Sequence, residues 1–98
     1  MAMHQPSHPG EVLKQLVIEP LDLSLTDVAE HLNISRKTLS RIVNTKSAIS
    51  PEMAVRLELV FHKPSAEHWL RLQNAYDLWN AKQQKNELHI QPYSAEYA

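Results

Sequence analysis

Apolar side chains recur every three or four residues along most of the 98-residue chain, and this period is that of an α-helix. The pattern predicts an all-α fold with five helices, at 10–18, 25–32, 36–44, 51–61 and 66–84. A chain of this length suits one domain. We expect the domain to span 9–84, after a flexible N-terminal arm at 1–8 and before an extended or disordered tail at 85–98.

The segment from 25 to 44, LTDVAEHLNISRKTLSRIVN, predicts two short helices joined by a tight turn. Ser24 is placed to cap the first helix, with Asp27 three residues later, as in a capping box. Asn33 tolerates the left-handed backbone that such a turn requires, and Ser35 is placed to cap the second helix. The apolar residues of the segment recur at helical spacing and are expected to face inward: Val28, Ala29, Leu32, Leu39 and Ile42. This layout is typical of a helix-turn-helix, whose second helix enters the major groove of DNA.

The outer face of that second helix is polar and cationic. It carries Arg36, Lys37, Ser40, Arg41 and Asn44. Arginine donates two hydrogen bonds to one guanine, so cations at the start of this helix are candidates for reading bases. A merely solvated helix face is the simpler interpretation of the charges alone. The intact caps, turn and apolar pattern around them favour DNA contact.

The helix expected at 66–84 is unusually rich in apolar residues. A stripe of large side chains recurs along it at helical spacing: Trp69, Leu72, Tyr76 and Trp79. Four preceding helices offer too little surface to cover so wide an apolar arc, which suggests a partner. We expect at least one tryptophan to pack in the core. The rest of the stripe predicts the contact of a homodimer.

The formal net charge of −1 conceals an uneven distribution along the chain. Residues 1–30 hold five acids and one base, whereas residues 31–51 hold four bases and no acid. A near-neutral protein with one locally cationic helix is expected to read DNA through fitted geometry, with modest non-specific affinity.

Several classes of protein are disfavoured. The absence of cysteine excludes a disulfide framework and fits a reducing cytoplasm, and neither a signal peptide nor a membrane-spanning apolar run is present. The six histidines form no HExxH or Cys/His pattern, so no metal site and no cofactor are predicted. No nucleophile, base and metal set converges either, so we assign no catalytic residue and expect no enzyme.

Five segments together resemble one known family: HPGEVL at 8–13, EPL at 19–21, ISRKTLSRIVN at 34–44, ISPEMAVRL at 49–57 and HWLRLQNAYDLW at 68–79. They are similar to the HigA antitoxins of bacterial toxin–antitoxin pairs, a branch of the lambda-repressor-like, XRE-type DNA-binding domains. The resemblance covers about residues 4–83. It implies a bacterial, cytoplasmic homodimer that represses its own operon on double-stranded operator DNA. It also implies that the protein neutralises a cognate, ribosome-dependent mRNA-cleaving toxin of the HigB type.

The resemblance also assigns roles to individual residues. Base contacts are expected from the start of the second helix and from the next turn of the same helix: Arg36, Lys37, Ser40 and Arg41. Phosphate contacts are expected from residues at its edges and at the start of the first helix: Ser24, Thr26, Thr38, Asn44 and Lys46. The chain departs from the family at two positions, since the family commonly has Gly in place of Asn33 and an Asn-Gly pair in place of Asn44-Thr45.

Two other functions remain open. A phage-like or orphan repressor without a toxin would have the same helix-turn-helix, and an adjacent toxin gene is what would distinguish it. An interaction module that keeps the shape without reading DNA is disfavoured by the unpaired cations. The sequence does not identify the toxin-binding surface. The candidates are the N-terminal arm, the acidic surroundings of the helix at 10–18, and the C-terminal tail.

Overall fold

A computed structural model describes residues 4–94, and that part of the chain contains helices and no strand, as predicted. The elements in chain order are α1 (Pro9–Leu13), the π-helix η1 (Lys14–Ile18), α2 (Leu25–Leu32), α3 (Arg36–Val43), α4 (Pro51–Phe61), α5 (Ala66–Gln83) and the short 3-10 helix η2 (Lys85–Leu88). The α1–η1 pair forms one continuous helical segment where a single helix was predicted. The helix η2 was not predicted, because only an extended or disordered tail was expected there.

Four serines determine where helices begin. The hydroxyls of Ser24, Ser35, Ser50 and Ser65 each accept a hydrogen bond from the amide three residues later, at 3.0, 3.0, 3.1 and 3.2 Å. Each bond satisfies an amide that has no partner within its own helix, which stabilises a helix by about 1 kcal/mol. The predicted starts of α2 to α5 are therefore confirmed. Asp27 does not return a capping bond and lies 3.7 Å from His31 instead.

The core lies where α1 to α4 meet the first half of α5. Its least exposed large side chains include Leu13, Leu39, Leu57 and Trp69, the last with 1% of its surface exposed. Trp69 was among the residues predicted for the dimer contact. Its burial within one chain removes it from that surface and identifies it as the tryptophan that packs in the core.

The apolar spacing of 10–18 predicts that Leu16 faces inward, and Leu21 and Leu23 are expected to pack in the connector after that helix; Leu16 and Leu21 instead lie on the surface. Leu16 is 70% exposed and Leu21 is 61% exposed, whereas Leu23 packs against the core. The π turn explains Leu16. Because the Glu19 amide donates to the Lys14 carbonyl five residues back, at 2.9 Å, the wider turn rotates the following residues. Ile18 is buried as a result.

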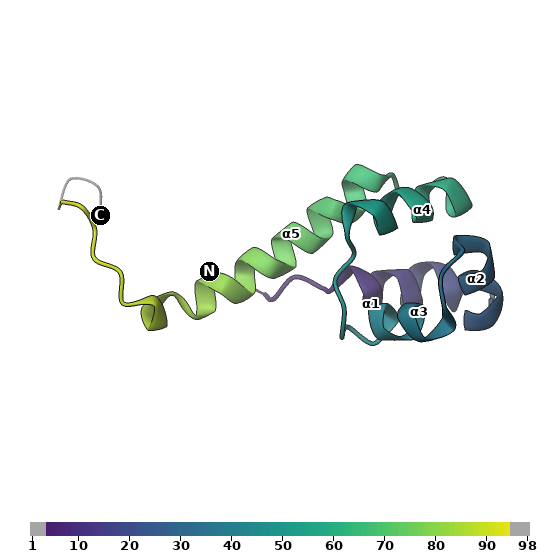
Figure 1. Ribbon diagram of the computed structural model, residues 1–98, viewed down its shortest axis with the longest axis horizontal. Helices are drawn as coiled ribbons and strands as arrows, with labels where there is room; N and C mark the ends of the chain where they lie inside the picture. Colours follow the sequence, from purple (N-terminus) through teal and green to yellow (C-terminus); the bar gives the residue numbers. More distant parts are fainter. Residues whose placement is uncertain (1–3, 95–98) are drawn as a thin grey trace.

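The second half of α5 projects beyond the core formed by the other helices. In Figure 1 it extends away from α1 to α4, and the N-terminal arm runs beside it. The buried residues of α5 are Ala66, Trp69 and Gln73, all in its first half. The Gln5 side chain donates a hydrogen bond to Asn80 at 3.4 Å, which joins the arm to the projecting half. Within 4–94, no helix is long and apolar enough to cross a membrane.

Candidate nucleic-acid interface

The turn between α2 and α3 is short because Asn33 reverses the chain by itself. Asn33 adopts φ 57° and ψ 46°, the left-handed conformation predicted for it. The amides of Asn33 and Ile34 then bond back to the carbonyls of Glu30 and Ala29, both at 3.0 Å. Ala29 is buried, and its small side chain allows the two helices to approach closely. The turn thus presents α3 at a defined angle.

The exposed face of α3 carries positive charge without partners. Leu39, Ile42 and Val43 are buried beneath it. Arg36 and Lys37 are exposed, and neither side chain forms an ion pair or a hydrogen bond with any part of the described chain. Two unpaired cations on one short helix attract phosphate and leave donors available to base edges.

Arg41 is arranged differently from these two cations. Its Nε donates to the Ser47 hydroxyl at 3.1 Å and its Nη2 donates to the Lys46 carbonyl at 3.3 Å. Arg41 therefore holds the loop that follows α3 while it remains exposed. Thr45 in this loop has φ 61°, a left-handed conformation that is strained for a β-branched residue. Thr45 thus adopts a conformation that favours glycine, at the position where the family commonly has glycine.

The remaining predicted contact residues lie around α3 and at the start of α2. Ser24, Thr26, Thr38, Asn44 and Lys46 are exposed, and Ser40 is half-buried. The Asn44 side chain donates to the Ser40 carbonyl at 2.9 Å, and the Ser35 hydroxyl bonds to the Thr38 hydroxyl at 2.8 Å. These bonds orient polar groups at both ends of α3.

Sequence reasoning missed how tightly α1 is pressed against the end of α3. Gly10 lies so close to α3 that a Cβ there would sit 1.8 Å from the Ile42 carbonyl oxygen. His8, which is 4% exposed, caps α1 by accepting a hydrogen bond from the Gly10 amide at 2.9 Å. Its ring meets Tyr76 of α5 edge-on, with ring centroids 4.9 Å apart. The one available signal was that Gly10 is the only glycine of the chain.

A second missed residue, Gln73, fixes the start of α4 from α5. Its side chain is 6% exposed, accepts a hydrogen bond from the Ile49 amide at 2.8 Å and donates one to Asp77 at 2.9 Å. The sequence offered no signal for it, because a lone glutamine on a helix is usually exposed.

The burial of His8 predicts a pH dependence of stability. Burial lowers the pKa of His8 below its ordinary 6.5, although Asp77, Glu11 and the Ser47 backbone act in the opposite direction. The unfolded chain therefore binds a proton at His8 more readily than the folded chain does. The contribution of His8 to the free energy of unfolding is fully present above pH 6.5 and decreases as the pH falls below that value. Urea unfolding of the wild type and His8→Asn between about pH 5 and pH 7.5 tests this, because asparagine preserves a capping oxygen without titrating. Parallel pH profiles of the two proteins would contradict it.

A capped two-helix unit with an exposed, unpaired cationic second helix defines this chain as a helix-turn-helix DNA-binding protein. A family model described as helix-turn-helix matches residues 13–68, more than half of the chain. The chain belongs to this XRE-type helix-turn-helix family.

Similar proteins include antitoxins. Virulence-associated protein A of Dichelobacter nodosus is 54% identical over 76 residues, which cover 78% of this chain and 74% of that protein. The structure of the antitoxin GraA is 30% identical with a TM-score of 0.84, covering 92% of this chain and 99% of that one. The Pseudomonas aeruginosa antitoxin HigA, solved with the higBA promoter, is 35% identical with a TM-score of 0.77, covering 91% and 99%. The chain therefore resembles HigA-type antitoxins, and one of these structures includes promoter DNA.

Proposed function

We propose that this protein is the antitoxin of a HigBA-type pair, a homodimer that represses its own operon and neutralises an mRNA-cleaving HigB-type toxin. The observation that carries the DNA-binding part is the unpaired cationic face of α3. The likeness to an antitoxin solved with promoter DNA supports the same reading.

Within this proposal, Arg36 and Lys37 read base edges with help from Ser40 and Arg41. The bonds of Arg41 to Lys46 and Ser47 give it a second task, because they hold the loop that carries Lys46. Phosphates are bound by the flanking polar groups: Ser24, Thr26, Thr38, Asn44 and Lys46. Contacts of this second kind set the register of the protein on DNA without reading sequence.

Arg36→Ala is expected to weaken operator binding by about 1–3 kcal/mol and to relax preference at one base position, because a bidentate contact to a guanine is lost. Fluorescence anisotropy on the protein's own promoter and on single-base variants measures both effects. Arg71→Ala is the matched control, since Arg71 is an exposed arginine of α5, away from α3. Equal operator affinity and equal base preference for the two variants would remove Arg36 from the interface.

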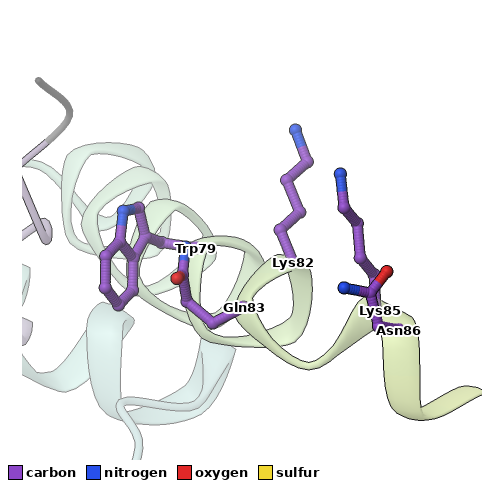
Figure 2. Close-up of a pocket in the computed structure, with 5 residues that line it drawn as sticks. All are labelled: Trp79, Lys82, Gln83, Lys85 and Asn86. Atoms are coloured by element: carbon purple, nitrogen blue, oxygen red, sulfur yellow. The ribbon is translucent and has the colours of Figure 1, made fainter.

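The dimer is assigned to the part of α5 that lies beyond the core. Tyr76 and Trp79 are only partly buried there, and Leu72, also partly buried, packs against the edge of the core. Trp79 lines an open hollow of about 490 Å³ together with Lys82, Gln83, Lys85 and Asn86. In Figure 2 its indole lies next to Gln83, and Lys82, Lys85 and Asn86 project further along the chain. A second copy of α5 would cover this apolar surface, and a two-fold dimer would present α3 to half-sites about 34–36 Å apart.

The toxin part of the proposal is tested through the neighbouring gene. We expect a neighbouring gene that encodes a small basic protein. Expression of that gene by itself should arrest growth, and co-expression of this antitoxin should prevent the arrest. An acidic surface near α1, with exposed Glu11 and Glu19, is the first candidate for docking a basic toxin. Charge reversal at both positions that leaves neutralisation intact would exclude that surface. A locus without a toxin would favour the orphan-repressor alternative.

A further inference from the structure

Arg56 of α4 makes contacts that the proposed DNA interface does not use. Its Nη1 donates to the carbonyls of Leu32 at 2.8 Å and Asn33 at 3.3 Å, which lie 24 and 23 residues away in the chain. Its Nη2 lies 3.8 Å from the Glu52 carboxylate, and the Arg56 side chain is 31% exposed. One guanidinium therefore grips the turn between α2 and α3 from a different helix.

The two carbonyls are among those in the turn that receive no hydrogen bond from a backbone amide. Asn33 and Ile34 use their own amides to satisfy Glu30 and Ala29, one turn back in α2. Within 4–94, no backbone amide donates to the carbonyl of Leu32 or of Asn33. A cation is also favoured at this end of α2 by the helix dipole.

Holding two consecutive carbonyls restrains the two adjacent peptide planes that meet at Asn33. α3 begins at Arg36, only a few residues beyond, so the orientation of these planes is passed directly to the cationic face. We propose that Arg56 is a positioning residue for operator recognition, which sets the angle at which α3 presents Arg36 and Lys37. The proposal rests on the proposed DNA-reading function.

This role predicts a specific kind of defect. Bidentate base contacts require that the side-chain donors of α3 be accurately placed relative to the base edges, whereas attraction to phosphates tolerates small rotations of α3. Arg56 lies in a groove between α2 and α4, together with His31, Leu59 and Val60, and not on the exposed face of α3. Its loss is therefore expected to weaken specific binding and leave the number of phosphate contacts unchanged.

The experiment compares Arg56→Met and Arg56→Lys with Arg71→Met, which removes an equal charge from an exposed site on α5. At a temperature where circular dichroism shows every variant folded, we expect Arg56→Met to lose about tenfold in operator affinity. Its non-specific affinity should change less than about twofold, with an unchanged slope of log K against log salt. Arg56→Lys should recover part of the loss, because it restores the charge but not the two-carbonyl fork.

A second measurement needs no DNA. In Arg56→Met, the amides of Asn33 and Ile34 should exchange with solvent about tenfold faster than in the wild type, while those of α5 stay unchanged. Operator affinity and exchange equal to those of Arg71→Met would overturn the proposal. So would a parallel loss of non-specific affinity with a reduced salt slope, which would make Arg56 a phosphate contact. A wild type without operator preference would overturn the proposed function and the recognition role together, and the exchange rates would still show whether Arg56 holds the turn.

Discussion

Gly10→Ala is expected to lower the free energy of unfolding by about 3 kcal/mol or more. The added Cβ would lie 1.8 Å from the Ile42 carbonyl oxygen and 2.7 Å from its carbonyl carbon. Both are backbone atoms of α3, so no side-chain rotation relieves the clash and α1 must move away from α3. The first turn of α1, with His8 as its cap, would move with it.

Whether Gly10→Ala lowers or raises the free energy of unfolding distinguishes a close α1–α3 contact from an exposed helical position. At an exposed helical position the same substitution stabilises, because alanine favours helix over glycine by about 1 kcal/mol. Thermal unfolding followed by circular dichroism measures the change, and a midpoint lowered by roughly 12 °C or more is expected for a domain of this size. Asn74→Ala, at an exposed position of α5, is the control for propensity alone. A Gly10→Ala protein that is as stable as the wild type would contradict the close α1–α3 contact.

Trp69→Ala and Trp79→Ala are expected to act on different equilibria, although the two tryptophans lie on one helix. Trp69 is 1% exposed, and its loss should destabilise the fold by about 3–5 kcal/mol, since the neighbouring core cannot fill the cavity. Its indole N–H is buried without a hydrogen-bond partner in the described chain. Removing this unsatisfied group is favourable, but the gain offsets only a small part of the loss in the free energy of unfolding. A change of this size approaches the whole stability of a small domain.

Trp79 lies beyond the last buried residue of α5, so its truncation should change the stability of one isolated chain by less than about 1 kcal/mol. If it anchors the two-fold contact, the dimer dissociation constant should rise about 30-fold. Sedimentation equilibrium measures the dissociation constant, and urea unfolding at several protein concentrations separates the two effects. A wild type that stays monomeric at micromolar concentration would exclude α5 as the dimer contact, and so would a Trp79→Ala dimer of unchanged affinity.

The parts of this molecule that could be predicted depend on residues close together in the chain. The capping serines act on the amide three residues later, and apolar periodicity acts over one turn. The left-handed turn at Asn33 has the same local origin. The helices α2 to α5, the turn and the outward cations of α3 were therefore predicted correctly. Leu16 was misplaced because a π turn breaks the regular period on which that inference depends.

The contacts that hold α3 in place join residues far apart in the chain, and only the tertiary structure identified them. Gly10 meets Ile42, Gln73 bonds to Ile49, and Arg56 reaches back 24 residues to Leu32. A glycine, a glutamine or an arginine carries no local signal of such a partner, since each partner is set by how the helices pack. By itself the sequence determined a helix-turn-helix with a cationic second helix. The packing of the helices decided which tryptophan belongs to the core, and which side chains fix the angle of α3.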